Sequence, residues 1–137
     1  MQINPKQVVE RKIISNFTNL DEQLQQNGID LTLKEDLVLE NMSHKNIELT
    51  ESFDMQDTFG VMHVRSSLSR KGIFMSFGLF DSGFCGNGGV SIYNMSGSKL
   101  ELPKGFRVCQ MVIYKGDPAK MYSGHYNQTT SVESKLK

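Results

Sequence analysis

Two arginines and three serines fall within six residues, in the run Arg65-Ser66-Ser67-Leu68-Ser69-Arg70. Each guanidinium group presents forked N–H donors that match phosphate oxygens, and serine hydroxyls add further donors. The run follows an apolar stretch and precedes a glycine, so it is expected in a turn after a strand. It predicts an anion-binding loop, although a solvated turn with two surface arginines would have the same composition.

A lone carboxylate, that of Asp81, ends the apolar run 73–80 and begins a glycine-rich turn with glycines at 83, 86, 88 and 89. A carboxylate at a strand end is held firmly enough to orient a water molecule for attack. An aspartate that closes a turn through its own backbone would fit the same pattern. No Lys-Ser/Thr pair follows the glycines, so they do not form a Walker loop.

Gln110 interrupts the apolar run from Val108 to Tyr114. A polar side chain in such a run needs a partner, so Gln110 is either bonded to backbone or faces a ligand. The three histidines and two cysteines share no metal-ligand spacing. That pattern argues against a zinc site and against a disulfide framework.

The charge balance excludes several kinds of partner. The 137 residues carry 15 Lys and Arg against 15 Asp and Glu, which gives a formal charge of zero and a sequence pI of about 6.8. Dedicated binders of nucleic acid or of membrane surfaces need excess positive charge, so neither partner is expected. The length fits one domain, and the N-terminus lacks a basic segment followed by an apolar run, which predicts a cytoplasmic protein.

The elements that must position these residues are mostly strands. From Asn27 onward, short apolar runs recur roughly every ten residues between Gly, Asn, Asp and Ser, as in a β-barrel or sandwich. The predicted runs are 29–33, 47–49, 59–61, 73–80, 90–93, 100–102 and 108–114. One helix is expected near the start, capped by Asn4 and ending near Asn19. The polar stretch 122–137 is expected to be either a frayed tail or a flap that orders over a ligand.

In their order along the chain, these signals resemble the family of trimeric deoxyuridine triphosphatases (dUTPases) and dCTP deaminases. The motifs are Gln26-Asn27-Gly28-Ile29-Asp30-Leu31, Arg65 to Arg70, Asp81-Ser82-Gly83-Phe84-Cys85-Gly86, Gly105-Phe106-Arg107-Val108-Cys109-Gln110 and Tyr126-Asn127-Gln128. Any one of them is common, but five in this order are specific. The resemblance implies a single mainly β domain over residues 1–137. Its fold would be a distorted β-barrel or jelly roll with one short N-terminal helix and a flexible C-terminal flap at 122–137.

One departure from the family separates its two activities. The deaminases carry a proton-shuttling Glu on the strand that leads to Tyr-Asn, and here its place falls on Ser91 in the run Gly88 to Asn94. A hydroxyl cannot replace a carboxylate as the base for attack of water on a pyrimidine ring. The resemblance therefore implies a dUTP diphosphatase that forms dUMP and pyrophosphate. The alternatives are a dCTP deaminase, including a bifunctional one, and a non-catalytic nucleotide-binding or regulatory protein of the same fold.

By resemblance, Asp81 activates the water that attacks the α-phosphorus, and Mg2+ is held by the phosphates while Asp30 contacts it through water. The segment 73–80 would form the base-binding hairpin. The residues expected to bind the nucleotide are Arg65, Ser66, Ser67, Arg70, Gly89, Ser91, Gln110, Tyr126 and Gln128. The resemblance also implies a homotrimer with its sites at subunit interfaces, located in the cytoplasm, or in the host cytoplasm if viral.

Overall fold

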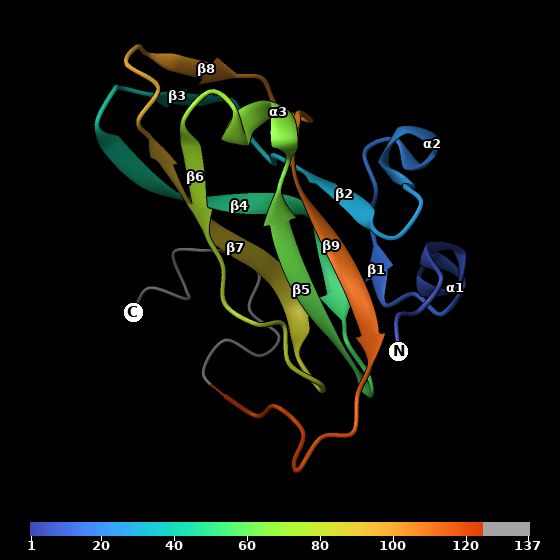
Figure 1. Cartoon of the computed structure of the whole chain (residues 1–137). Coiled ribbons are helices and arrows are strands. Elements are labelled where there is room, and N and C mark those ends of the chain that lie inside the picture. Colours follow the sequence, from blue (N-terminus) through green and yellow to red (C-terminus); the bar gives the residue numbers. More distant parts are fainter. Residues whose placement is uncertain (125–137) are drawn as a thin grey trace.

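Antiparallel strands are the main regular elements of residues 1–124, the part of the chain that the computed structural model describes (Figure 1). In chain order the elements are α1 (Pro5–Glu10), β1 (Ile14–Ser15), α2 (Leu20–Gln23), β2 (Ile29–Thr32), β3 (Leu37–Leu39), β4 (Ser43–Asp54), β5 (Thr58–Val64), α3 (Ser66–Ser69), β6 (Ile73–Ser76), β7 (Cys85–Asn94), β8 (Leu100–Leu102) and β9 (Arg107–Lys115). The mainly β class predicted from the sequence is confirmed. Across this stretch no helix has the length and apolar character needed to cross a membrane.

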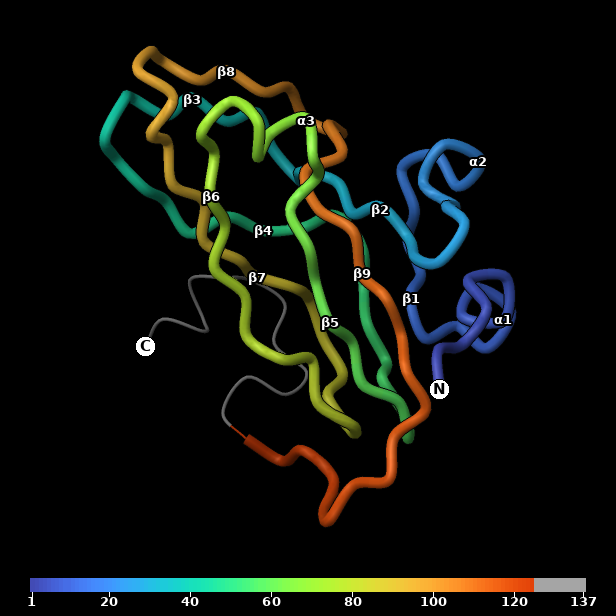
Figure 2. The backbone as a smooth tube through the Cα atoms, in the orientation of Figure 1, coloured from blue at the N-terminus to red at the C-terminus, as the bar shows by residue number. Residues whose placement is uncertain are grey.

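The strands form three antiparallel sheets. One joins β1, β4, β7 and β6 in that order, the second joins β2, β9 and β5, and the third pairs β3 with β8. Figure 2 shows β9 running between β2 and β5. Its register places Gln110 opposite Asp30 on β2 and opposite His63 on β5. The predicted polar residue of β9 is therefore flanked by side chains from both neighbouring strands.

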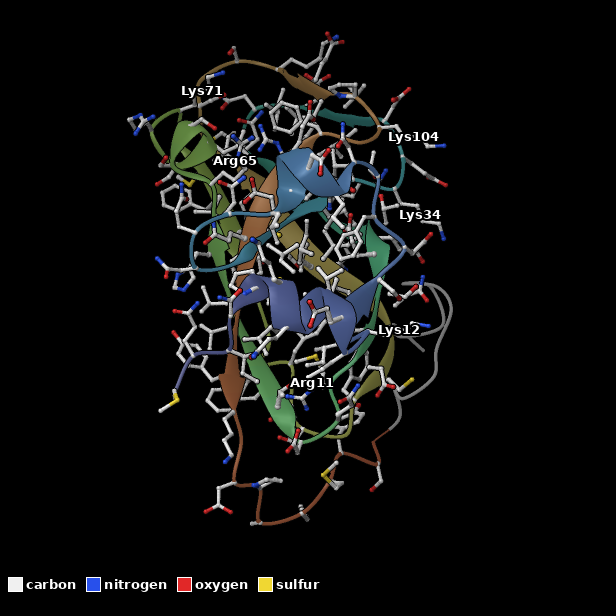
Figure 3. The ribbon with its side chains drawn as sticks, turned by 90° about the vertical axis from the view of Figure 1, so that its right-hand side faces the viewer. Arg11, Lys12, Lys34, Arg65, Lys71 and Lys104 are labelled. Carbon is white, nitrogen blue, oxygen red and sulfur yellow. The ribbon has the colours of Figure 1, made fainter. Side chains whose placement is uncertain are left out.

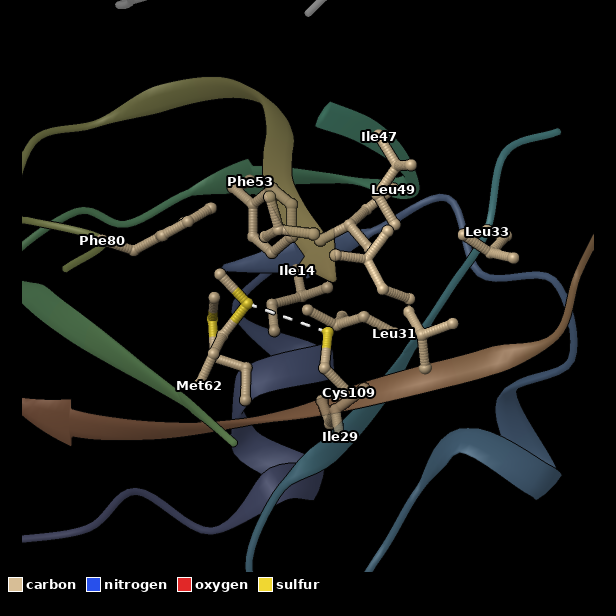
Figure 4. Close-up of a cluster of buried hydrophobic side chains, with 14 of the residues drawn as sticks. Ile14, Ile29, Leu31, Leu33, Ile47, Leu49, Phe53, Met62, Phe80 and Cys109 are labelled. Carbon is tan, nitrogen blue, oxygen red and sulfur yellow. Dashed lines mark hydrogen bonds between the residues drawn. The ribbon is translucent and has the colours of Figure 1, made fainter. Parts of the chain in front are cut away.

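Buried apolar side chains fill the space between the first two sheets (Figure 4). Alternate residues of β4 point into this core, as a strand with one solvated face requires. From the other sheet, Leu31 and Cys109 pack into the same cluster and are fully buried. The sulfur of Cys109 lies 3.9 Å from that of Met62. Both cysteines are free thiols, and burial raises the pKa of Cys109.

The N-terminal helix is shorter than its sequence pattern predicts. It ends at Glu10 instead of near Asn19. Lys12 and Asn16 adopt φ angles of 57° and 64°, which lie outside the helical region. Between them Ile14 joins the first sheet as part of β1 and is fully buried. Burial of this apolar side chain in the sheet therefore overrides the helical spacing of the sequence.

Other predictions are wrong in detail. The segment 73–80 is neither one strand nor a self-contained hairpin, because β6 ends at Ser76 and pairs with β7. Gly86, Gly88 and Gly89 lie within β7 and not in a turn. The elements α2, α3 and β3 were not predicted, and each has only three or four residues. Such short elements contain too few residues to show a period.

Candidate functional site

A buried carboxylate, that of Asp30, lies at the centre of a polar cluster on the β2–β9–β5 sheet. Its side chain is 4% exposed. Oδ2 of Asp30 lies 3.2 Å from Nη1 of Arg107 and 3.9 Å from Nε of Arg65. Gln110 donates to Oδ1 and Gln25 donates to Oδ2, each at 3.3 Å. One buried negative charge thus faces two positive charges, which offsets the cost of removing the carboxylate from water.

The two guanidinium groups of this cluster are fixed from several elements. Arg65 follows β5, and its Nη1 donates to the carbonyl of Arg107 at 3.0 Å. Arg107 begins β9, and its Nη1 donates to the carbonyl of Glu22 in α2 at 2.8 Å. The side chains remain 27% and 31% exposed, so both reach the surface. The cluster therefore keeps one excess positive charge at the surface and can bind an anion.

The remaining members of the predicted anion loop lie on α3 or, in the case of Arg70, directly after it. Arg65 occupies the N-cap position of this single helical turn, and Leu68 anchors it in the core. Ser66 and Arg70 are exposed, and Ser67 is half-buried. The predicted anion loop is therefore a helical turn that directs polar side chains to the surface beside the Asp30 cluster.

A second buried carboxylate, Glu51 on β4, supports the strand that carries Asp30. Its Oε1 accepts from the Thr32 N–H at 2.9 Å, and its Oε2 accepts from the Thr32 hydroxyl at 2.6 Å. Gln23 donates both to Oε2 of Glu51 and to the carbonyl of Asp30, each at 2.8 Å. Burial raises the pKa of Glu51, and the hydrogen bonds from Thr32 and Gln23 oppose that rise. Glu51 thus ties β4 to α2 and β2.

Asp81 lies at the opposite end of β5 from the Asp30 cluster. Phe80 pairs with Gly60 near the start of β5, whereas Arg65 follows the end of that strand. Arg65 comes five positions after Gly60, which corresponds to about 16 Å at the usual rise of a strand. One copy of the chain therefore does not bring Asp81 to the two arginines.

The carboxylate of Asp81 is exposed and borders an open pocket of about 650 Å³. Its backbone carbonyl accepts a hydrogen bond from the Phe84 N–H at 3.1 Å, so the residue does close a turn. The side chain takes no part in that turn and makes no ion pair with residues 1–124. An exposed carboxylate on a fixed turn can orient a water molecule.

Figure 3 shows the same separation of the two regions along the molecule. Arg65 and Lys71 lie near one end, and Arg11 lies toward the other. Arg11 is ion-paired with Asp57 at 3.0 Å, and the carbonyl of Asp57 accepts from the Ser82 hydroxyl next to Asp81. Arg11 and its partners therefore lie at the same end of the molecule as Asp81.

Gly89 and Ser91 lie on the outer face of the first sheet, on β7. Their neighbours along the strand point into the core. The Ser91 hydroxyl donates to Oδ1 of Asn46 on β4. Glu48, opposite Gly89 on β4, is ion-paired with Lys34 at 2.9 Å. Within one chain these two predicted residues are thus on a different sheet from the Asp30 cluster.

One chain therefore brings Asp30, Arg65 and Gln110 together and keeps Asp81, Gly89 and Ser91 away from them. Tyr126 and Gln128 lie outside the described residues. Sequence reasoning missed Arg107, Gln25, Glu51 and Gln23 as members of the polar network. Arg107 could have been found, because it belongs to the quoted motif that ends in Gln110. No sequence signal marks the other three.

Comparison with known proteins shows which proteins the chain is related to. The dUTPase family model matches residues 19–135. Over 76 residues the chain is 41% identical to the dCTP deaminase of Pyrococcus horikoshii, a stretch that is 54% of this chain and 49% of that protein. It is 38% identical over 65 residues to a dUMP-forming dCTP deaminase of Aquifex aeolicus, covering 45% of this chain and 36% of that one. The chain thus spans about half or less of the length of these relatives.

Solved structures share the fold. The dCTP deaminase of Agrobacterium tumefaciens superposes with a TM-score of 0.75 at 17% identity, over 84% of this chain and 48% of that one. The EIAV dUTPase gives a TM-score of 0.62 at 22% identity, over 86% and 95% of the two chains. The barrel-like fold is thus the one shared by dUTPases and dCTP deaminases. The chain belongs to the dUTPase family, which confirms the resemblance inferred from its motifs.

Proposed function

We propose that this protein is a dUTP diphosphatase that converts dUTP to dUMP and pyrophosphate. The proposal depends on Ser91 and Asp81, the residues at the two positions that separate the deaminase reaction from the diphosphatase reaction. Ser91 stands where the family resemblance places the deaminase carboxylate, and it is bonded to an amide oxygen. Asp81, the carboxylate needed for attack on phosphorus, is present and exposed on a fixed turn.

In the proposed reaction, Asp81 orients a water molecule and accepts its proton as the water oxygen bonds to the α-phosphorus. The bond from the α-phosphorus to the bridging oxygen breaks, and pyrophosphate leaves with the electron pair. Arg65 and Arg107 reach the surface together and would bind the phosphates, with further donors from α3 and from Gln110. Their positive charge would stabilise the leaving group.

The proposed site is shared between copies of the chain in a homotrimer. The support is the separation of Asp81 from Arg65 along β5, together with the position of Ser91 on the other sheet. A site that needs all three residues must take them from more than one copy. Such a contact joins different surfaces of the two copies, as in a closed ring.

Magnesium is proposed to arrive with the triphosphate, because this cation prefers oxygen ligands and retains several waters. Among residues 1–124, no cluster of three or more His, Cys, Asp or Glu side chains could hold a metal ion. Asp30 is buried, and both its oxygens accept hydrogen bonds from the protein. This arrangement fits the orientation of two guanidinium groups and does not fit direct ligation of a metal. Contact of Asp30 with the metal through water stays a prediction.

A dCTP deaminase is the second candidate, favoured by the names of the matching relatives. It would need a carboxylate beside the pyrimidine in place of Ser91. Glu48 lies on the neighbouring strand, opposite Gly89, but its carboxylate is ion-paired with Lys34. The chain therefore offers the deaminase reaction a less suitable base than it offers the diphosphatase reaction.

The test is to incubate the purified protein with dUTP and, separately, with dCTP in the presence of Mg2+, and to separate the products. We expect dUMP and pyrophosphate from dUTP. Asp81→Asn should lower kcat by about 10²-fold to 10⁴-fold while nucleotide binding is retained. Ammonia from dCTP would identify a deaminase instead. Binding without any product would identify a non-catalytic protein, and full activity of Asp81→Asn would remove this residue from the mechanism.

A further inference from the structure

The segment that follows β9 folds back along the loop that carries Asp81. We call residues 116–122 the strap and residues 77–84 the Asp81 loop. In Figure 2 the strap turns beneath the lower ends of β5 and β7. The Tyr122 N–H donates to the carbonyl of Ser82 at 2.7 Å. The Gly116 N–H and the Ser82 hydroxyl donate to one carbonyl, that of Asp57, at 3.0 and 3.3 Å.

Aromatic rings continue this contact into the core. The ring of Tyr122 meets Phe84 edge-on, with centroids 5.6 Å apart. Phe84 meets Phe80 at 5.4 Å, and Phe80 meets Phe53 at 4.8 Å, again edge-on. Phe80 and Phe84 are buried and stand on either side of Asp81 in the sequence. Edge-to-face pairs of this kind stabilise by about 0.5–1.5 kcal/mol beyond their burial, so the strap is attached to the residues that fix the Asp81 turn.

Glycines allow the close approach of the two segments. Gly83 has a φ of +89°, and a Cβ there would lie 2.7 Å from the backbone nitrogen of Tyr122. A Cβ on Gly116 would lie 2.3 Å from the carbonyl oxygen of Asp57 and 2.8 Å from the Ser82 hydroxyl. Gly83 in the loop and Gly116 in the strap thus leave room for atoms that a side chain at either position would displace. Each segment therefore has a glycine where the other segment approaches it.

From these contacts we infer that Tyr122 is a positioning residue for Asp81. The Asp81 carboxylate has no hydrogen bond of its own to hold it in the described chain, so its direction depends on the backbone from Phe80 to Phe84. The strap supplies one wall of that turn through the Tyr122 N–H and the Tyr122 ring. The catalytic part of this inference rests on the proposed role of Asp81, whereas the restraint on the loop does not.

The restraint is tested by hydrogen exchange of the loop amides without substrate. The Gly83 and Phe84 N–H groups donate to Gln56 and Asp81, so their exchange reports opening of the turn. In Tyr122→Ala we expect exchange of these two amides to be at least about tenfold faster. Tyr122→Phe, which keeps the ring, should exchange like the parent.

The matched control is Tyr93→Ala, which removes a partly exposed ring at the far end of β7 from the Asp81 loop. It should leave the exchange of Gly83 and Phe84 unchanged. Unchanged exchange in Tyr122→Ala would overturn the inference. So would equal acceleration in the Tyr93 control, because the effect would then be a general loss of stability.

The consequence for catalysis is measured on the same variants. A misplaced base lowers turnover more than binding, so Tyr122→Ala should lower kcat about tenfold to 100-fold and change KM for dUTP much less. Tyr122→Phe should restore kcat. Faster exchange of the loop amides in Tyr122→Ala together with an unchanged kcat would overturn the positioning role. If the loop amides of Tyr122→Ala exchange faster but the parent protein does not hydrolyse dUTP, the proposed function is overturned and the restraint on the loop stands.

Discussion

At Glu51, burial and hydrogen bonding act on one carboxyl group in opposite directions. Burial raises its pKa from the ordinary value of 4.5, and the hydrogen bonds from Thr32 and Gln23 lower it by a smaller amount. The folded protein therefore holds this proton more tightly than the unfolded chain does. The stability that Glu51 contributes is present below about pH 4.5 and is lost as the pH rises through the raised pKa.

Glu51→Gln removes this titration with little change of shape. Below about pH 4.5 the variant should be less stable by about 1–2 kcal/mol, because its amide N–H₂ faces donors where the carboxyl group accepts. As the pH rises, the advantage of the parent should shrink, since only the parent then buries a charge. Urea denaturation of both proteins from pH 4 to 8 measures the difference. A difference that stays constant or grows with pH would contradict the raised pKa.

Individual site residues were predictable where they belong to a short motif. Asp30, Arg65 and Gln110 were singled out from the sequence, and the structure places them in one cluster. Glu51 and Gln25 were missed because their roles depend on tertiary contacts. Glu51 meets Thr32 only because β4 packs against β2, and no local pattern along the chain encodes that contact. Motifs thus identify the residues at the centre of the cluster better than the residues that support it.

The junction of α2 and β2 shows how an element is set by a close approach. Gly28 lies just before β2, where a Cβ would be 2.6 Å from the backbone oxygen of Met111 and 2.8 Å from Oε1 of Gln110. The backbone oxygen cannot move aside without displacing β9. The absence of a side chain at Gly28 therefore lets β2 enter the sheet beside β9 with Asp30 opposite Gln110.

Gly28→Ala should destabilise the protein by about 1–3 kcal/mol, because the added methyl group must push β2 away from β9. Gly78→Ala is the matched control, since a Cβ at Gly78 would meet no atom within 4 Å. That variant should change the free energy of unfolding by less than about 0.5 kcal/mol. Denaturant unfolding of both variants checks the pair, and equal losses would show that the contact at Gly28 does not decide the effect.

Strands were predicted more reliably than helices, and the reason lies in their neighbours. The run from Val108 to Tyr114 is apolar because β9 is the central strand of its sheet, so its sequence alone marks it as buried. The helical spacing near the N-terminus gave a wrong helix end because Ile14 pairs with β4 in the first sheet. At Phe80 the apolar run continues beyond β6, and its ring packs in the core from an irregular segment. Apolar runs therefore predict burial and leave the local conformation open.

The distribution of site residues over the whole molecule could not be predicted from their order in the sequence. Asp30 and Gln110 lie on one sheet with Arg65 directly after its strand β5, whereas Ser91 lies on the outer face of another sheet. Asp81 lies at the opposite end of β5 from Arg65. A sequence records the order of these motifs and gives no distance between them. The structure shows that Arg65 follows the end of β5 while Asp81 lies near its start. The proposed reaction therefore needs a site formed by more than one chain.

A shared site can be tested by mixing two variants that lack different halves of it. Asp81→Asn and Arg65→Ala should each be inactive alone for the proposed reaction. When they are unfolded together and refolded as a mixture, some contacts should join an intact Asp81 from one copy to an intact Arg65 from another. With random assembly, about one quarter of the sites should be complete, because each half has an even chance of being intact.

The matched control mixes Asp81→Asn with Asp81→Ala. Both chains then lack the same half, so no arrangement of copies completes a site, and the mixture should stay inactive. Sedimentation of each mixture shows whether the copies assemble under the assay conditions. Assembled but inactive mixtures of the first pair would show that Asp81 of one copy and Arg65 of another do not complete a site, and would overturn the shared site. Activity near one quarter of the parent would instead show that the surfaces at the two ends of β5 meet between subunits, and would explain why a chain can keep its catalytic carboxylate so far from its own arginines.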